Sequence, residues 1–238
     1  YCSAGYPALT STVEVITALQ EYGADVIEIG IPYSDPLADG PVIQHSNMIA
    51  IKNGMSIDVL FKQIEDIRLK VQLPLILMGY MNPVLQYGFE KFCADAQKAG
   101  IDGLIIPDLP VFEFDMQYKA VFEKHGLKFI FLITPETTEE RIKQIDERCS
   151  GFIYAVSSSS TTGNNKAIVE QTAYFEKLRQ LKLKNPVLVG FGIKDRETFN
   201  TACQHTNGAI IGSAFIKALE NSTSINQTVK KFINSITE

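Results

Sequence analysis

Two carboxylate side chains in the first part of the chain stand in contrasting surroundings. Glu28 interrupts the apolar run Val26-Ile27-Glu28-Ile29, where a charged side chain is expected only if it faces a functional cavity. Burial disfavours the charged form of a carboxyl group, so we expect a raised pKa for Glu28, in a range useful for proton transfer. Asp39 follows in a more polar loop, and a dry and a wetter carboxylate together make a candidate acid–base pair. The alternative is a buried glutamate that binds a backbone amide beside a solvated loop.

The loop between these two carboxylates is rich in proline. Pro32, Pro36 and Pro41 frame Asp35 and Asp39. Proline restricts the backbone and lowers the entropy of a loop, so such a frame can hold a carboxylate in place without a helix or strand.

Glycine-rich turns recur near the end of the chain and are candidates for binding an anion. They read Thr161-Thr162-Gly163, Gly190-Phe191-Gly192-Ile193 and Gly212-Ser213-Ala214. Glycine lets backbone amides approach an anion closely, and a helix that begins at Ser213 would direct its N-terminus at that anion. The alternative is that these glycines only end strands.

Other residue types give weaker signals. His45, His125 and His205 share no motif, and Cys2, Cys93, Cys149 and Cys203 form no CxxC pair, so we expect neither a metal site nor a disulfide framework.

Three further features bear on the reaction class. Asp108 follows an apolar run, and a catalytic, a turn-forming and an interface role all stay open for it. The run Ser157–Ser160 lacks the G-x-S-x-G pattern of a serine nucleophile. No lysine ends a predicted strand, which argues against a Schiff-base aldolase.

Short apolar runs alternate with helical segments along the whole chain. Most are continuous Val/Ile/Leu runs, as in parallel strands covered on both faces. With the remnant Tyr1–Gly5 they make eight βα units, which favour a (β/α)8 barrel with its active site at the C-terminal ends of the strands over an open α/β sheet. No linker divides the chain, so we expect one domain over residues 1–238. The predicted strands are Tyr1–Gly5, Asp25–Gly30, Leu73–Met78, Asp102–Ile106, Lys128–Ile133, Gly151–Ala155, Pro186–Gly190 and Gly208–Gly212.

Helices are predicted between these strands from apolar side chains at three-to-four spacing. One such stripe joins Leu60, Phe61, Ile64 and Ile67. Two capping boxes, Ser11 with Glu14 and Thr137 with Glu140, are predicted to open helices.

Composition excludes several partners. The 238 residues carry a formal net charge of -5 and no long basic run, so we expect no nucleic-acid or anionic membrane partner. No apolar stretch reaches the roughly 20 residues of a membrane span. The scattered cysteines suggest reduced thiols and a cytoplasmic protein. Because Tyr1 begins inside a predicted strand, we expect further residues upstream.

The run from Glu28 to Pro41 closely resembles the signature of tryptophan synthase alpha subunits. The resemblance continues, in order, through nearly the whole chain. The matching segments are Gly79–Pro83, Ile106–Pro110, Thr161–Gly163, Gly190–Ile193 and Gly212–Ala214.

This resemblance implies a cofactor-free lyase that cleaves indole-3-glycerol phosphate to indole and glyceraldehyde 3-phosphate. Glu28 matches the acid–base residue of the family, and Asp39 matches the aspartate that binds the indole N–H. The substrate-binding positions implied are Tyr1, Tyr80, Tyr154, Thr162, Gly163, Phe191, Gly192, Gly212 and Ser213.

The resemblance also implies a partner. Family members bind a beta subunit that carries pyridoxal phosphate, in an alpha2-beta2 complex, and pass indole to it. Pro32, Asp35 and Asp108 match positions that face this partner or transmit closure. The family's N-terminal helix and part of its first strand are missing here, and the serine-rich run Ser157–Ser160 departs from many relatives. A stand-alone indole-producing lyase, a non-catalytic phosphate-binding partner and another phosphate-binding barrel are the alternatives.

Overall fold

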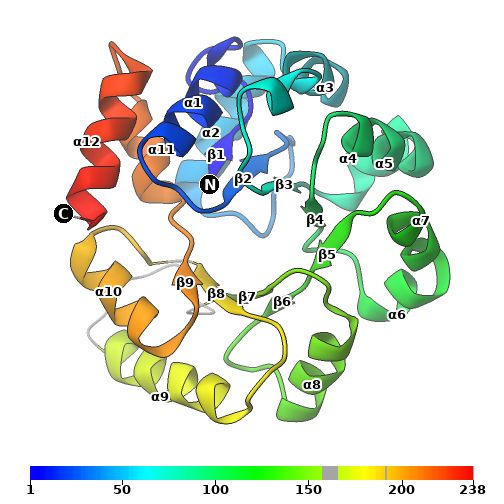
Figure 1. Cartoon of the computed structure of the whole chain (residues 1–238), viewed down its shortest axis with the longest axis vertical. Helices are drawn as coiled ribbons and strands as arrows, with labels where there is room; N and C mark the ends of the chain where they lie inside the picture. Colours follow the sequence, from blue (N-terminus) through cyan, green and yellow to red (C-terminus); the bar gives the residue numbers. More distant parts are fainter. Residues whose placement is uncertain (157–165, 191, 238) are drawn as a thin grey trace.

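The apolar runs form short parallel strands that gather into a ring at the centre of the molecule (Figure 1). The computed structural model describes residues 1–156, 166–190 and 192–237. The architecture is the predicted (β/α)8 barrel. Its strands are β1 (Cys2–Ser3), β2 (Ile27–Gly30), β3 (Leu75–Met78), β4 (Gly103–Ile105), β5 (Lys128–Ile130), β6 (Leu132–Ile133), β7 (Ile153–Val156), β8 (Val187–Gly190) and β9 (Gly208–Ala209).

Every strand pairing in the ring is parallel. β1 to β5 form one sheet and β6 to β9 another. At one seam β5 continues into β6 through Phe131, whose carbonyl accepts a hydrogen bond from the Tyr154 amide of β7 at 2.9 Å. At the other seam the backbone nitrogen of Tyr1 donates to the Ile211 carbonyl at 3.0 Å. Hydrogen bonds therefore connect the strands at both seams and close the barrel.

Most predicted strands differ from the observed ones by one or two residues at an end, and two differ more. The predicted strand Lys128–Ile133 is interrupted at Phe131, which divides it into β5 and β6. The last predicted strand, Gly208–Gly212, pairs only over Gly208–Ala209.

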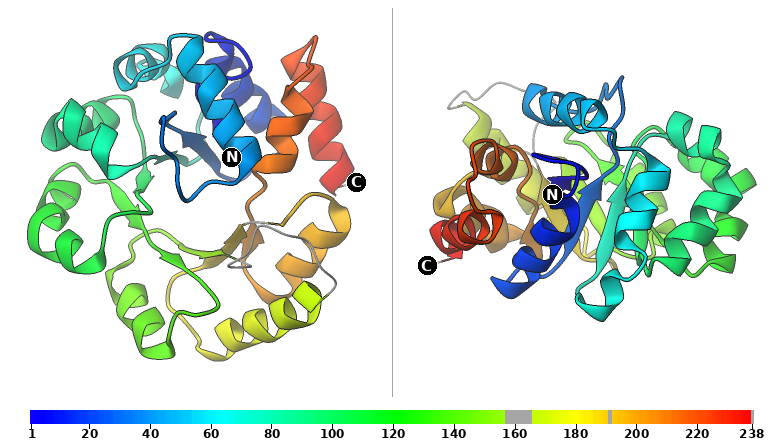
Figure 2. Two further views of the ribbon diagram at one scale, coloured as in Figure 1. Left: turned by 180° about the vertical axis from the view of Figure 1, so that it is seen from behind. Right: turned by 90° about the horizontal axis from the view of Figure 1, so that it is seen from above.

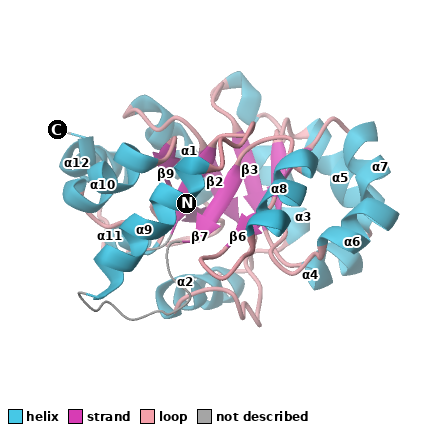
Figure 3. Ribbon diagram, turned by 90° about the horizontal axis from the view of Figure 1, so that it is seen from below, coloured by secondary structure: helices cyan, strands magenta, loops and turns pink. Residues whose placement is uncertain are grey.

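Helices surround the ring, as the views from behind and from the side show (Figures 2 and 3). α12 packs along α1, so the last helix joins the first (Figure 1). The helices are α1 (Ser11–Glu21), α2 (Pro41–Lys52), α3 (Ile57–Ile64), α4 (Met81–Tyr87), α5 (Phe89–Lys98), α6 (Val111–Glu113), α7 (Lys119–Lys124), α8 (Glu139–Arg148), α9 (Lys166–Gln180), α10 (Arg196–His205), α11 (Ser213–Leu219) and α12 (Ile225–Thr237), with a 3-10 turn at Ile67–Leu69 and a π-helical turn at Phe114–Tyr118.

Three predicted details of the helices are wrong. The stripe from Leu60 to Ile67 ends as an α-helix at Ile64, and Ile67 lies in the 3-10 turn. The N-caps of α1 and α8 are Thr10 and Thr138, one residue away from the predicted Ser11 and Thr137. The described residues do form one capping box, at Asp195 before α10.

Strand periodicity separates two apolar layers. Alternate strand residues point to opposite faces, so one set packs outward against the helices and the other fills the barrel. The inner cluster includes Ile76, Met78, Ile105, Ile130, Phe152, Tyr154 and Val156. No helix in the described part of the chain is long and apolar enough to cross a membrane.

Candidate active site

Glu28 lies inside the barrel because of its position in β2. Its neighbours Ile27 and Ile29 belong to the outer apolar layer, so the Glu28 side chain points inward. In the sheet register it stands opposite Ile76, a residue of the inner cluster. The side chain is 5% exposed, as the sequence predicted.

The Glu28 carboxyl group is buried without a hydrogen-bond partner. Both of its oxygens lack one among the described residues. Burial raises the pKa of this carboxyl to about 7, and the nearby Asp39 carboxylate also raises it. The predicted alternative, a glutamate satisfied by a backbone amide, is therefore wrong. A carboxyl group with this pKa can both accept and release a proton near neutral pH.

Asp39 is held near the barrel mouth by Tyr80. The Tyr80 hydroxyl donates to Asp39 Oδ2 at 3.1 Å and accepts from the amide of Ala38 at 3.0 Å. Burial raises the pKa of Asp39 to about 6, while the hydrogen bond from Tyr80 lowers it. These two hydrogen bonds, one donated and one accepted by the Tyr80 hydroxyl, connect the segment after β3 to the proline-rich loop after β2. The tyrosine thus fixes the position of the second carboxylate.

Tyr1 and Tyr154 fill space that two glycines leave open. A Cβ atom at Gly30 would overlap the hydroxyl of Tyr1, and a Cβ at Gly190 would overlap that of Tyr154. Burial raises the pKa of both phenols, and the charges of Glu28 and Asp39 raise them further. The two rings therefore lie in the barrel mouth near both carboxylates, and each depends on a residue without a side chain.

The glycine-rich turns are described only in part. Gly212 borders Tyr1 and the first turn of α2, and α11 begins at Ser213 as the sequence predicted. Gly192 has a positive φ of 77°, a conformation that favours glycine. Thr162, Gly163 and Phe191 lie outside the described residues, as does the serine run 157–160.

The three residues expected at a partner surface lie in loops that follow β2 and β4. Asp35 is exposed, Pro32 is half-buried, and the Asp35 carboxylate accepts a hydrogen bond from Ser34 at 2.5 Å. Asp108 is also exposed, and both of its oxygens accept from the amide of Met81, at 3.0 and 3.1 Å. Asp108 thereby connects the loop after β4 to the first residue of α4, next to Tyr80.

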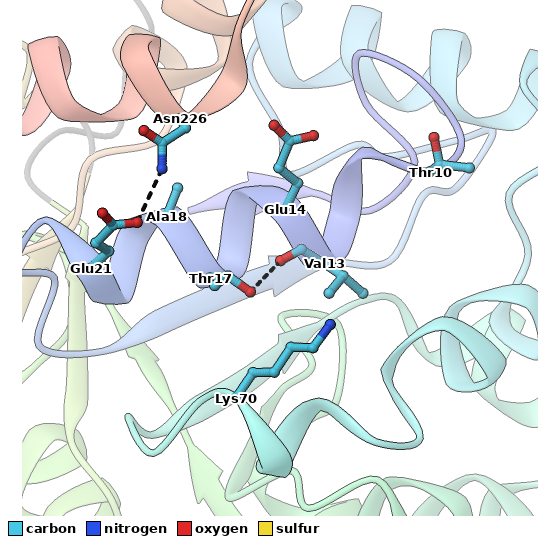
Figure 4. Close-up of a pocket in the computed structure, with 8 residues that line it drawn as sticks. All are labelled: Thr10, Val13, Glu14, Thr17, Ala18, Glu21, Lys70 and Asn226. Carbon is cyan, nitrogen blue, oxygen red and sulfur yellow. Dashed lines mark hydrogen bonds between the residues drawn. The ribbon is translucent and has the colours of Figure 1, made fainter.

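A separate groove lies on the outer surface of the molecule (Figure 4). It has a volume of about 560 Å³ and runs along α1, where Asn226 Nδ2 donates to Glu21 Oε2 at 3.0 Å. Neither Glu28 nor Asp39 lines this groove. The carboxylate pair therefore lies elsewhere, inside the barrel.

Sequence reasoning missed a set of hydroxyl groups beside Tyr1. Ser3 and Ser46 are buried, and their Oγ atoms are 2.7 Å apart. A signal for Ser3 was available, because it lies two residues after Tyr1 in a strand and must share its inward face. Ser46 carries no such signal, since it lies on a helix 43 residues away. Among the described residues, no group of three or more His, Cys, Asp or Glu side chains is arranged to hold a metal ion.

The fold is that of the (β/α)8 class of enzymes, and its site holds two carboxyl groups with raised pKa values. Its buried carboxyl group lies two residues before the C-terminal end of β2, and a second carboxylate stands in the loop that follows. In this class, active sites lie at that end of the strands.

Comparison with known proteins identifies the family. The model of the tryptophan synthase alpha chain family matches residues 1–238. The tryptophan synthase alpha chain of Flavobacterium psychrophilum is 56% identical over 238 residues, covering 99% of this chain and 93% of that one. The alpha subunit of Pyrococcus furiosus superposes with a TM-score of 0.89 at 36% identity, covering 99% and 95% of the two chains. A tryptophan synthase structure from M. tuberculosis, in the aminoacrylate-bound form, superposes with a TM-score of 0.84 at 33% identity, covering 98% and 90%. This chain belongs to the tryptophan synthase alpha chain family.

Burial of Glu28 has a consequence for stability that the Glu28→Gln variant tests. Because the pKa rises from an ordinary 4.5 to about 7 on folding, the folded state binds the proton more tightly, and stability falls as pH increases between these values. Above pH 7 this decrease in the free energy of unfolding is complete, and it amounts to about 3 kcal/mol at most. We expect Glu28→Gln to be more stable than the parent chain at pH 8 and similar to it at pH 4.5.

Chemical denaturation at several pH values measures this difference. Glu21→Gln, which alters an exposed glutamate of α1, is the matched control and should leave the pH dependence unchanged. Equal stability of Glu28→Gln and the parent chain at pH 8 would mean that folding does not raise the pKa of Glu28.

Proposed function

We propose that residues 1–238 act as one catalytic barrel that cleaves indole-3-glycerol phosphate to indole and glyceraldehyde 3-phosphate. The observation that carries this proposal is the Glu28 carboxyl group, which is buried, has both oxygens free of hydrogen bonds, and has a pKa of about 7. A structural role would leave such a group bonded, because an unpaired buried polar atom costs free energy. Its available oxygens fit a role in proton transfer.

The proposed reaction is a retro-aldol cleavage that needs only proton transfers. Glu28 removes the proton from the glycerol hydroxyl next to the indole, and the bond between that carbon and the indole ring breaks. The electron pair passes to the ring, which has been protonated at the same ring carbon as an indolenine. Glu28 helps deliver that ring proton, and Asp39 accepts a hydrogen bond from the ring N–H and stabilises the cation. The net change moves one proton from oxygen to carbon.

The surrounding residues would hold the substrate at its two ends. Tyr1, Tyr80 and Tyr154 line the indole side, where the described rings stand near both carboxylates. The phosphate would bind to backbone amides of the last three βα units. The residues proposed for this end are Thr162, Gly163, Phe191, Gly192, Gly212 and Ser213.

We further propose that a tryptophan synthase beta subunit, which carries pyridoxal phosphate, binds at the loops of Pro32, Asp35 and Asp108. Large apolar side chains are exposed in the same region: Leu37 in the loop after β2 is 91% exposed, and Phe112 in α6 is 73% exposed. Exposed apolar side chains of this size favour contact with another protein. The four free cysteines support the prediction of a cytoplasmic location, which stays a prediction.

Replacement of Glu28 tests the catalytic proposal. Glu28→Gln keeps the shape of the side chain but cannot transfer a proton, so we expect kcat for indole release to fall by about 10²–10⁴-fold. Binding of glycerol 3-phosphate, a probe for the phosphate end, should be retained. Glu14→Gln, on the outer face of α1, is the control and should keep full activity. Undiminished release by Glu28→Gln would exclude the proposed role.

Indole release by the purified chain, measured with and without a cognate beta subunit, tests the partner proposal. We expect slow release alone and strong acceleration by the partner, whereas fast release alone would favour a stand-alone lyase. Phe112→Ser should weaken the acceleration without changing release by the isolated chain, since it removes apolar contact area but no catalytic group. Leu69→Ser is the control, because Leu69 is 82% exposed and precedes β3, at the opposite end of the barrel. Equal effects of both substitutions would contradict a partner surface at α6.

A further inference from the structure

The loop between β2 and α2 is hydrogen-bonded to its neighbour at two places. Near α2, the Tyr80 hydroxyl donates to Asp39 Oδ2 at 3.1 Å and accepts from the Ala38 amide at 3.0 Å. Near β2, Asn82 Nδ2 donates to the hydroxyl of Tyr33 at 3.0 Å. Both contacts come from the segment in which β3 leads into α4. This one segment therefore holds the loop at both of its ends.

A contact between two aromatic rings connects these two places. The ring centroids of Tyr33 and Tyr80 are 5.4 Å apart, and the ring planes are inclined at 36°. Tyr33 is half-buried, and Tyr80 is buried at 7% exposure. Tyr33 thus packs against the side chain whose hydroxyl binds Asp39, and its own hydroxyl is bound by Asn82.

The orientation of the Tyr80 ring controls its hydrogen bond to Asp39. The hydroxyl of a tyrosine lies at the far end of the ring, so a small tilt of the ring moves the hydroxyl more than any other atom of the side chain. At 3.1 Å the bond to Asp39 is already longer than an ordinary O–H···O bond, and further displacement would break it. A contact that limits the tilt of Tyr80 therefore also protects this bond.

We propose that Tyr33 is a positioning residue for the reaction: its ring, held by Asn82, packs against Tyr80 and keeps the Tyr80 hydroxyl on Asp39. No hydrogen bond joins Tyr33 to either carboxylate among the described residues, so its effect passes through Tyr80. The inference rests on the role proposed above for Asp39, which accepts a hydrogen bond from the indole N–H. Tyr33 therefore acts on the stabilisation of the ring cation, and not on the proton transfers of Glu28.

The titration of Asp39 reports the strength of the bond from Tyr80. This hydrogen bond lowers the pKa of Asp39, against the effect of burial, so weakening the bond raises that pKa. We expect Tyr33→Leu, which removes the ring, to raise the pKa of Asp39 by about half a pH unit or more. Tyr80→Phe should raise it at least as much, because it removes the donor entirely.

The other titratable groups around Asp39 stay the same in Tyr33→Leu, so they do not account for such a shift. The groups that interact with the charge of Asp39 are Glu28, Tyr1, Tyr80 and Tyr154.

The kinetics of indole release should change in a way that points to the transition state. A displaced Asp39 stabilises the ring cation less, and this cation develops only as the reaction proceeds. We expect Tyr33→Leu to lower kcat and kcat/KM together, by up to about 10²-fold, with little change in KM.

Smaller substitutions separate the contribution of the ring from that of the hydroxyl. Tyr33→Phe and Asn82→Ala both remove the hydrogen bond between these residues and keep the ring, so their effects should be equal, smaller than that of Tyr33→Leu and of the same sign. Combining them should add nothing to either one. In the Tyr80→Phe background, Tyr33→Leu should not change the Asp39 titration further, since the bond through which it acts is absent.

A ¹³C NMR titration of the Asp39 carboxyl in the full chain without substrate measures these shifts, with the signal assigned by its loss in Asp39→Asn. Tyr22→Leu is the matched control. Tyr22 is also a half-buried tyrosine that binds an asparagine, since its hydroxyl donates to Asn226 Oδ1 at 2.7 Å. It precedes β2 and so lies at the opposite end of the barrel, and its replacement should leave both the titration and kcat unchanged.

The outcomes separate the positioning role from a role in loop stability and from the catalytic proposal. An unchanged Asp39 titration in Tyr33→Leu would overturn the inference, and so would an equal loss of kcat from Tyr33→Leu with and without the Tyr80 hydroxyl. If Tyr33→Leu does not fold, Tyr33→Phe and Asn82→Ala decide, and the absence of a shift in both would overturn it. Full activity of Asp39→Asn would instead overturn the role of Asp39, whatever the titrations give.

Discussion

The burial of one carboxyl group inside the barrel is the constraint on which the rest of the site depends. β2 carries Glu28 on its inward face, between residues that pack outward, so the chain cannot turn this side chain to solvent without losing the strand register. Removing a carboxylate from water raises its pKa, and no described hydrogen bond compensates for the loss. The protein therefore holds a carboxyl group with a pKa near neutral pH at the centre of its fold, and the burial of its charged form lowers the stability of the folded state.

The residues around the buried Glu28 are positioned by specific contacts of the fold. Asp39 stands in a proline-framed loop and is held there by Tyr80, so a second, wetter carboxylate adopts a fixed position. Glycine at positions 30 and 190 admits two tyrosine rings to the barrel mouth. The same arrangement links the site to the surface, because Asp108 binds the amide of Met81 next to Tyr80. A protein that bound the loop of Asp108 would thus contact a loop that is hydrogen-bonded to Met81. Met81 is adjacent to Tyr80, whose hydroxyl holds Asp39.

Much of this was predictable from local sequence. The apolar runs predicted the parallel strands and the barrel, and the charge inside one of them predicted a buried Glu28, because strand periodicity and the cost of burial act over a few residues. Details that depend on exact geometry were less accessible. The strand is interrupted at Phe131 although the apolar run is continuous, and neither predicted capping box forms, since the N-caps of α1 and α8 lie one residue from the predicted positions. The contact between Ser3 and Ser46 joins a strand to a helix 43 residues later, and no local pattern encodes such a pairing. Thr162, Gly163 and Phe191 stay predictions, since they lie outside the described residues.

The pH dependence of kcat/KM for indole release by the unmodified chain tests the central claim most directly. This parameter reports the ionisation of essential groups in the free enzyme. Because Glu28 and Asp39 interact, the apparent values belong to the pair. If the barrel holds Glu28 as a base near neutrality, activity should rise with pH and reach half its maximum near 7, with the second carboxylate contributing near 6. A rate that is already maximal at pH 5 and constant up to pH 8 would contradict the account, because Glu28 would then ionise as it does in water.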